Sequence, residues 1–269
     1  MPKAAVLGSP IAHSKSPLLH TAAYRVLDLP WTYERYDVDD QGLAPFLAAH
    51  EGEFRGLSLT MPLKPRAFAL AHEHDEAART TEAVNTLVFG DALRGYNTDV
   101  VGFIEALRAV DGPPVSSATI LGTGSTARSA AFAMVSEGVA ELHIHGRRAE
   151  AVRALQEWLQ RFTVTVHAHR WTDAPVSTDV VISTTVAGAT DNLPLPQAPG
   201  LLFESIYAPW PTAYAARWMD AGGRVLSGLD LLVHQAAQQV ILMTRVDAAN
   251  RGAIVAAMYG ALNGLSAGT

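Results

Sequence analysis

The chain has no cysteine among its 269 residues. This absence excludes disulfide bonds, a thiolate nucleophile and a metal site with cysteine ligands, and it fits a protein of a reducing compartment. Charged residues are scarce at 17%, and a net charge of −6 offers no surface for a nucleic acid. No apolar run reaches the roughly 18 residues that a membrane helix needs, and the amino terminus enters a strand without a signal-peptide layout. We therefore expect a cytoplasmic protein with neither a nucleic-acid nor a membrane partner.

Hydrophobic residues make up 49% of the chain, and its length suits two domains of ordinary size or one large barrel. Short apolar strands alternate with helical stretches, which is typical of an α/β fold. The turn at Gly90 and Asp91 predicts a hairpin, so the first sheet should be mixed. Strands are expected at residues 4–7, 31–38, 57–60, 83–89, 93–96, 117–121, 141–145, 164–167, 180–183, 201–206 and 224–226. Helices are expected at residues 18–27, 43–49, 65–72, 75–82, 99–110, 149–161, 212–221 and 246–263, and between the turn at residues 122–128 and residue 137.

The strand at residues 57–60 ends before Pro62, which cannot continue a hydrogen-bonded ladder. Lys64 therefore lies where a strand end meets a loop, the usual location of chemistry in an open α/β sheet. A lysine held there can exchange a proton with a substrate oxygen, and the alkoxide formed in ketone reduction needs such a donor. Asp99 is a plausible partner for this lysine, although it would also serve well as a helix N-cap.

Two hydroxyl side chains, Ser14 and Ser16, precede the first helix. Ser16 is a good N-cap, and Pro17 suits the first helical position. Capping alone would explain Ser16 and leave Ser14 without a task. Because free N–H groups point outward at a helix start, the two hydroxyls there predict a seat for a carboxylate.

Residues 117–128 are typical of the strand, glycine turn and helix that open a dinucleotide-binding unit. Gly122 permits the tight turn, and Gly124 lets a pyrophosphate approach the backbone at the helix N-terminus. The third glycine of the usual pattern is missing. The candidate cofactor-binding residues of this turn are Gly122, Thr123, Gly124, Ser125 and Thr126.

Arg147 and Arg148 indicate the type of dinucleotide. They follow the next strand, about 20 residues beyond Gly124, where an NAD enzyme usually has an acidic residue for the ribose hydroxyls. Two guanidinium groups instead suit a 2′-phosphate, to which arginine can make paired hydrogen bonds. As mere surface residues they would place positive charge at a helix N-terminus, which is unfavourable. The arginines therefore predict NADP.

Several motifs together resemble those of shikimate dehydrogenase. The first half of the chain carries four segments that resemble its substrate-domain signatures in order and spacing, namely residues 8–17, 58–64, 83–86 and 95–99. Later segments that resemble the family lie at residues 181–185, 204–212 and 228–236, so the resemblance covers essentially the whole chain. Three positions depart from the usual pattern: Ser58 where many members carry Asn, Glu82 where many carry Gly, and Glu204 where members often carry Asp.

The resemblance implies two α/β domains. A mixed-sheet substrate domain would comprise residues 1–98 plus about 235–269, to which the C-terminal helix returns, and a Rossmann-like NADP domain would comprise residues 99–234. The implied reaction is the reversible NADPH-dependent reduction of 3-dehydroshikimate to shikimate in chorismate and aromatic amino-acid biosynthesis. Lys64 and Asp99 would be catalytic.

The resemblance also implies binding roles. Ser14, Ser16 and Tyr207 should hold the substrate carboxylate, and the residues expected at the ring are Ser58, Thr60, Asn85, Asp99 and Gln235. Beyond the glycine turn and the arginines, the implied cofactor-binding residues are Thr184, Ser205 and Gly228. The Ser58 departure would thin the hydrogen bonding to the ring without removing the catalytic groups.

Three other functions remain open at this point. A quinate/shikimate enzyme that prefers NAD would share the fold and the lysine–aspartate pair, but Arg147 and Arg148 argue against it. A non-catalytic nucleotide sensor on the same fold predicts decay of that pair, and both members are present. A folate dehydrogenase fits the two serines less well. Either a monomer or a homodimer is compatible with the sequence.

Four histidines alternate along two expected strands, so His143 shares a face with His145 and His167 shares one with His169. As metal ligands they would need a third partner, and no carboxylate is identified at ligand spacing. We therefore expect no metal site and assign these histidines a surface or packing role.

Overall fold

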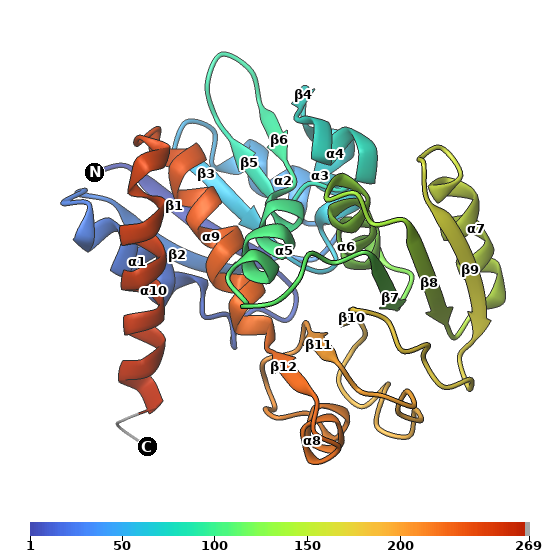
Figure 1. Cartoon of the computed structure of the whole chain (residues 1–269). Helices are drawn as coiled ribbons and strands as arrows, with labels where there is room; N and C mark the ends of the chain where they lie inside the picture. Colours follow the sequence, from blue (N-terminus) through green and yellow to red (C-terminus); the bar gives the residue numbers. More distant parts are fainter. Residues whose placement is uncertain (267–269) are drawn as a thin grey trace. The chain divides into compact units, whose positions relative to one another are not determined.

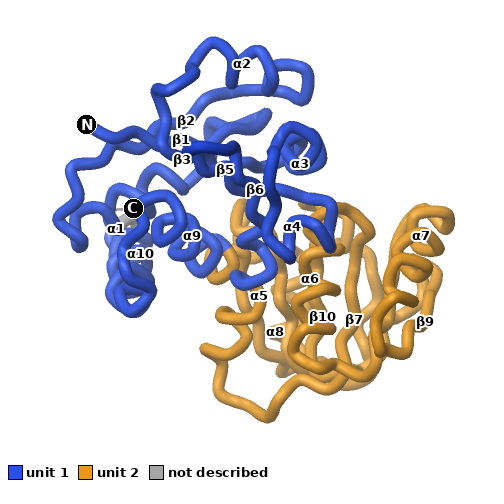
Figure 2. Tube along the Cα trace, turned by 90° about the horizontal axis from the view of Figure 1, so that it is seen from above, with its two compact units in different colours: residues 1–102, 232–269 blue, residues 103–231 orange. Residues whose placement is uncertain are grey.

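The computed structural model describes residues 1–266 (Figure 1). The chain divides into two compact units: residues 1–102 with those from 232 onward form the first, and residues 103–231 form the second (Figure 2). Both divisions fall within helices, α5 (Thr98–Arg108) and α9 (Gly228–Thr244), so each of these helices begins in one unit and ends in the other. Within this described part of the chain, no helix is long and apolar enough to cross a membrane.

The first unit contains a mixed sheet. Its strands are β1 (Lys3–Gly8), β2 (Thr32–Asp37), β3 (Phe54–Leu59), β4 (Glu73–His74), β5 (Thr86–Val88) and β6 (Arg94–Tyr96). They lie in the order β2-β1-β3-β5-β6-β4. β1 is parallel to β2 and β3, whereas β5 is antiparallel to β3 and β6. The β5–β6 pair is the hairpin that the turn at Gly90 and Asp91 predicts.

Helices cover this sheet and bring the end of the chain back to it. They are α1 (Ser16–Val26), α2 (Leu43–Ala49), α3 (Lys64–Leu70), α4 (Glu76–Thr81), most of α9, and α10 (Arg251–Ser266), which follows the 3-10 turn η1 (Ala248–Asn250). α10 packs against α1, so the expected return of the last helix to the first domain is confirmed. The helix expected from residue 246 begins later, because the Asp247 carboxylate caps η1 by accepting from the Ala249 N–H.

The second unit contains a sheet in which each neighbouring pair of strands is parallel. Its strands are β7 (Ser117–Leu121), β8 (Glu141–Gly146), β9 (Thr165–Arg170), β10 (Val180–Ser183), β11 (Leu201–Glu204) and β12 (Arg224–Leu226), and its helices are α6 (Ser125–Ser136), α7 (Ala149–Leu159) and α8 (Ala213–Asp220). The strand order is β12-β11-β10-β7-β8-β9. The chain runs outward from β7 and then returns to β10 on the other side of β7. Open α/β sheets bind their ligands at such a switch point.

Burial separates the central strands of this sheet from its edge. Every residue of β10 and β11 is buried, as expected for parallel strands covered on both faces. β9, at the edge of the sheet, has no buried residue. The core on one side is built around the fully buried Tyr214 and Trp218 of α8, which pack with Leu202 of β11. The chain therefore has the α/β fold that the alternation of its elements predicts, in the two domains that the family resemblance implies.

Candidate active site

An ion pair between Lys64 and Asp99 forms the centre of the candidate site in the first unit. Lys64 begins α3, just beyond β3, and Asp99 lies in the first turn of α5. The Lys64 Nζ donates to the Asp99 Oδ2 over 2.5 Å, and the two side chains are only 14% and 7% exposed. A buried charge is costly unless its other hydrogen-bonding positions are also filled. The groups around Asp99 therefore decide whether this pair is held in place.

Asn97 provides the side-chain cap at the start of α5. Its Oδ1 accepts from the backbone N–H of Asp99 over 3.2 Å, from the position directly before the helix begins at Thr98. The interpretation of Asp99 as the N-cap is therefore wrong, since Asp99 lies one residue inside the helix. Its carboxylate remains available to other side chains.

Asn85 binds the second oxygen of that carboxylate. The Asn85 Nδ2 donates to the Asp99 Oδ1 over 2.8 Å, and Asn85 is buried. The Asn85 Oδ1 accepts from the backbone N–H of Thr98 at 2.9 Å, from the Thr98 hydroxyl at 3.1 Å and from the Thr86 hydroxyl at 2.8 Å. These donors fix the orientation of the amide, because its oxygen must face them. The amide nitrogen is thereby directed at Asp99.

Gln235 of α9 lies beside the same group of residues. Its Oε1 is 3.4 Å from the Thr98 hydroxyl, and its Nε2 donates to the Leu232 carbonyl over 2.9 Å. The structure thus brings together four of the residues that the sequence predicts for the site, from four separate segments of the chain: Lys64, Asn85, Asp99 and Gln235.

The two serines lie at the start of α1, and neither occupies its N-cap position. α1 begins at Ser16, with Lys15 in the N-cap position and no capping bond from the Lys15 side chain. The Ser14 Oγ accepts from the backbone N–H of Ser16 over 3.3 Å. The prediction of Ser16 as the N-cap is therefore wrong by one position. Ser14, for which capping offered no role, accepts the first N–H of the helix.

Ser58 belongs to a buried polar network that sequence reasoning missed. Its hydroxyl donates to the Gln239 Oε1 over 2.7 Å and accepts from the Tyr33 hydroxyl over 2.6 Å. Thr60, two residues further on at the end of β3, is half-buried. The one signal for Gln239 was its position, since it lies one helical turn after Gln235 and so shares a face with it.

In the second unit, the expected cofactor-binding residues lie at the carboxyl ends of the strands. Each group follows the carboxyl end of a strand: Gly122, Thr123, Gly124, Ser125 and Thr126 follow β7, Arg147 and Arg148 follow β8, Thr184 follows β10, Ser205 follows β11, and Gly228 follows β12 closely. Because the strands are parallel neighbours, these groups share the edge at which an open α/β sheet binds its ligand.

Gly122 and Gly124 meet different steric demands in the turn after β7. Gly122 has a φ of +125°, and an added Cβ would lie 2.4 Å from the Thr184 Oγ1. A Cβ at Gly124 would have no neighbour within 4 Å. Gly124 is also the N-cap of α6, with no side-chain capping bond. Open space at the start of a helix is what a pyrophosphate needs.

Arg147 and Arg148 are both exposed at the turn between β8 and α7. Arg148 occupies the N-cap position of α7 and makes no capping bond there. The turn lies close to the glycine turn, because a Cβ at Gly146 would lie 2.7 Å from the Thr123 Cγ2. Accessible guanidinium groups beside the glycine turn fit the 2′-phosphate of NADP.

Glu204 is the last residue of β11, and Tyr207 lies three residues beyond it. Burial raises the pKa of the half-buried Tyr207 above its ordinary value. Glu204 is fully buried, and burial raises its pKa to about 7. The Glu204 Oε1 accepts from the Ile206 N–H over 3.3 Å, which holds the turn that leads to Tyr207.

Comparison with known proteins identifies the family. The profile of the shikimate dehydrogenase substrate binding domain matches residues 6–87. A shikimate dehydrogenase (NADP(+)) of Methylobacterium radiotolerans is 36% identical over 256 residues, which cover 87% of this chain and 88% of that protein. The chain belongs to the shikimate dehydrogenase family.

Solved structures of the family share the fold over nearly the whole chain. The Mycobacterium tuberculosis shikimate dehydrogenase is 35% identical with a TM-score of 0.86, covering 97% of this chain and 100% of that one. The Thermus thermophilus shikimate 5-dehydrogenase, solved in complex with NADP(H) and shikimate, is 30% identical with a TM-score of 0.84 and the same coverage.

The backbone at Glu82, where the chain departs from the shikimate dehydrogenase pattern, explains why glycine suits this position. Glu82 ends α4 in the left-handed region, with φ 55° and ψ 37°. Glycine adopts this conformation freely, whereas another residue bears a strain of roughly 1 kcal/mol. The glycine that many family members carry here suits the same turn.

One expectation about the histidines is wrong. A carboxylate does lie at ligand distance, because the Glu141 Oε1 is 2.9 Å from the His167 Nε2 and 3.4 Å from the His143 Nε2. Glu141 begins β8 two residues before His143, so their side chains share a face. The sequence contained this alternation, but only the pairing of β8 with β9 adds His167.

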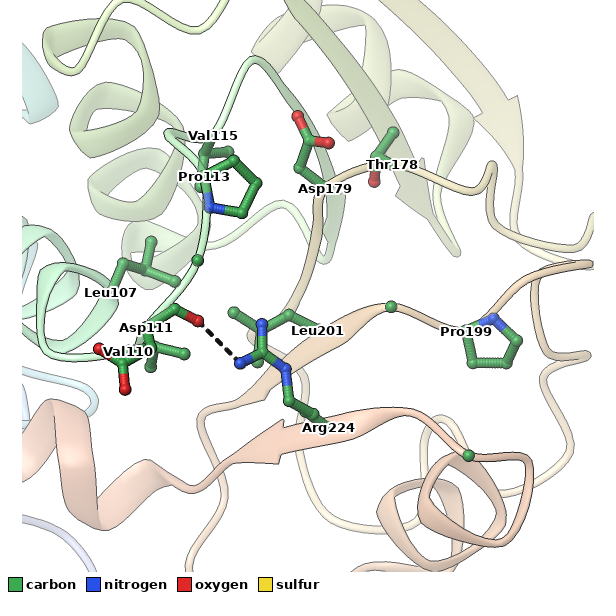
Figure 3. A pocket seen from close by; sticks show the side chains of 13 residues that line it. Leu107, Val110, Asp111, Pro113, Val115, Thr178, Asp179, Pro199, Leu201 and Arg224 are labelled. Atoms are coloured by element: carbon green, nitrogen blue, oxygen red, sulfur yellow. Dashed lines mark hydrogen bonds between the residues drawn. The ribbon is translucent and has the colours of Figure 1, made fainter.

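A pocket of about 530 Å³ lies at the amino ends of the strands of the second sheet (Figure 3). Its lining includes residues that precede or begin strands, such as Asp179 before β10 and Arg224 of β12. These two charged groups are engaged: the Asp179 carboxylate accepts from Ser116 and Ser117, and the Arg224 guanidinium donates to the Asp111 carbonyl over 2.9 Å. The pocket holds none of the candidate residues and is not the catalytic site.

Proposed function

We propose that this chain catalyses the reversible NADPH-dependent reduction of 3-dehydroshikimate to shikimate. The observation that carries the proposal is the buried Lys64–Asp99 pair, in which each carboxylate oxygen receives a separate donor. Membership of the shikimate dehydrogenase family supports this substrate and cofactor. A non-catalytic sensor would have no use for a buried ammonium group with this support.

In the proposed mechanism, Lys64 acts on the oxygen that gains charge. Bound NADPH supplies the hydride that converts the ketone to a secondary alcohol. The Lys64 ammonium carries three N–H donors, so it can turn one toward the developing alkoxide and deliver its proton while another stays on Asp99. Asp99 keeps the ammonium in place, and its remaining lone pairs can accept from a substrate hydroxyl. In the reverse direction, the lysine takes the proton back.

We assign the substrate carboxylate to the start of α1. The Ser14 and Ser16 hydroxyls and the first N–H groups of this helix offer donors for an anion. Tyr207 should add its hydroxyl, which is a protonated donor at neutral pH even with an ordinary tyrosine pKa; burial raises that pKa further. The groups assigned to the ring hydroxyls are Thr60, Asn85, Asp99 and Gln235.

For Ser58, we propose a supporting role through Gln239. Its proton is donated to Gln239, and Gln239 in turn donates to the Asn85 carbonyl over 3.3 Å. A serine committed in this way positions the segment that carries Asn85 and contributes less to the ring directly than a longer amide would. This refines the direct contact that the family resemblance implies.

For the cofactor, we propose that the pyrophosphate binds at the N-terminus of α6 and the 2′-phosphate at Arg147 and Arg148. The fit rests on the space in front of Gly124 and on the exposure of both arginines. Thr184, Ser205 and Gly228 should line the rest of the same edge. Residues 1–98 with 235–269 would then form the substrate domain, and residues 99–234 the cofactor domain. We further propose a cytoplasmic location and a monomer or homodimer.

The test is the appearance of nicotinamide absorbance with shikimate as substrate, measured with NADP and with NAD and repeated with quinate. We expect rapid reduction of NADP with shikimate and slow turnover in the other three combinations. Preference for NAD with quinate would retain the catalytic pair and overturn the cofactor assignment. Binding of NADPH without turnover of either acid would favour the sensor.

A further inference from the structure

Four histidines form a ladder across β8 and β9. The register pairs His143 with His167 and His145 with His169. The paired rings stack, with centroids 4.8 Å apart and planes at 19° for the first pair, and 4.7 Å and 12° for the second. Side chains at alternate positions of neighbouring strands point to the same face, so all four rings share one side of the sheet.

Glu141 extends this ladder by one position on the same face. Its Oε1 lies 2.9 Å from the His167 Nε2 and 3.4 Å from the His143 Nε2. The three potential ligand atoms all lie within 4.8 Å of one another. A tetrahedral zinc ion with bonds of 2.0–2.1 Å holds neighbouring ligands about 3.3 Å apart. Both distances from the carboxylate are close to that value. The two imidazole rings are stacked, so they must turn toward the carboxylate to surround an ion.

We propose that Glu141, His143 and His167 bind a divalent transition-metal ion, with zinc as the representative ion. Two imidazoles and one carboxylate are ligands typical of Zn²⁺, whereas Mg²⁺ and Ca²⁺ prefer oxygen ligands throughout. Three protein ligands leave a fourth position for water. The ion would link β9, an edge strand, to β8.

His169 supports His143 from behind. The His143 Nδ1 lies 2.8 Å from the His169 Nε2, so the nitrogen that is not directed at Glu141 already has a partner. Ligating histidines are commonly held in one ring orientation through their second nitrogen.

An ion can reach the three ligands from solvent. The side chains of His167 and Glu141 are 45% and 47% exposed, whereas that of His143 is 9% exposed. The site thus has one anchored ligand and two accessible ones. The metal site uses the amino-terminal half of β8, whereas Arg147 and Arg148 follow the carboxyl end of that strand. The proposed metal site does not depend on the proposed reaction.

The test is titration calorimetry of the untagged full chain with Zn²⁺, with Mg²⁺ as the comparison ion. We expect one Zn²⁺ per chain, no comparable heat with Mg²⁺, and a rise in Tm with Zn²⁺. Co²⁺ in place of Zn²⁺ should give the strong visible absorption of a tetrahedral site.

Matched variants identify the ligands. Glu141→Gln and His167→Gln change accessible side chains, so both should fold, and each should weaken Zn²⁺ binding by roughly tenfold or more. His50→Gln, in the first unit, should leave it unchanged. Zinc affinity equal to that of the unchanged chain in both Glu141→Gln and His167→Gln would overturn the proposal, as would the absence of stoichiometric binding.

Discussion

The two units build their candidate sites from different materials. In the first unit the site consists of side chains that are buried and hydrogen-bonded to one another, with Asn85 and Lys64 on the two oxygens of Asp99. In the second unit the site consists mainly of backbone at strand ends, of open space at Gly124 and of exposed arginines. Folding alone assembles the site of the first unit. The site of the second unit offers N–H and guanidinium donors to a phosphate.

This difference follows from the chemistry each unit must provide. A proton donor to a developing alkoxide must be aimed and desolvated, which requires neighbours that fix it. A dinucleotide phosphate instead needs several N–H groups and positive charge, which a helix start and surface arginines supply. Substitutions in the first unit should therefore change catalysis, and those in the second should change cofactor binding or stability.

The largest expected effect is that of Lys64→Ala on catalysis. Loss of the proton donor should lower kcat about 1000-fold, while the affinity for NADPH, measured by fluorescence titration, should stay close to that of the unchanged chain. Lys3→Ala removes a partly exposed lysine of the same unit and serves as the control. If NADPH binding were lost together with kcat, the separation of roles between the units would be broken.

Glu204 is an exception to the comparison, because it is a fully buried carboxyl at the end of a strand in the second unit. Burial raises its pKa from 4.5 to about 7. The folded state therefore retains its proton when the unfolded state has lost it. The contribution to the free energy of unfolding is present below pH 4.5 and is lost as the pH rises through about 7.

Glu204→Gln should remove that loss, since the amide stays neutral. Urea denaturation at pH 5 and pH 8 measures the free energy of unfolding of both proteins. At pH 8 that of the variant should be larger than that of the unchanged chain by on the order of 3 kcal/mol. Glu157→Gln changes an exposed carboxylate of α7 and should show no such pH dependence. If the free energy of unfolding changed with pH equally in Glu204→Gln and in the unchanged chain, the Glu204 carboxyl would not retain its proton in the folded state.

Gly122→Ala and Gly124→Ala separate backbone strain from ligand access within a single turn. Gly122→Ala combines a φ of +125° with a 2.4 Å approach to Thr184, so the free energy of unfolding should fall by about 2–3 kcal/mol. Gly124→Ala has open space, and its stability should change by less than about 0.5 kcal/mol. Its methyl group should instead weaken NADP binding about tenfold. The reverse pattern would show that the open space is not the phosphate path.

The last expected effect is on cofactor choice. Arg147→Ala combined with Arg148→Ala should raise the Michaelis constant for NADP by roughly 10- to 30-fold and that for NAD by much less, because only NADP carries the 2′-phosphate. Arg153→Ala, an exposed arginine of α7, is the matched control. Equal effects on both cofactors would remove the 2′-phosphate from the proposal.

The sequence by itself determined the parts that depend on neighbouring residues. The α/β alternation, the hairpin at Gly90 and Asp91, and the glycine turn after β7 each follow from local patterns of strands, helices and turn residues. For the same reason, the sequence alone predicted the separate cofactor-binding segments, although their function awaits the tests above. Helix starts were less secure, and α5 and α10 show why: an alternative capping residue shifts a helix start with little change in local pattern.

Only the tertiary structure decided how distant residues meet. It placed Asn97 as the cap of α5, committed Ser58 to Gln239 and Tyr33, and brought Glu141 to His167. Each of these depends on strand register or on which side chain reaches a donor first, and neither is encoded in the spacing of residues along the chain. Local chemistry therefore identified the components, and packing determined which of them bind one another.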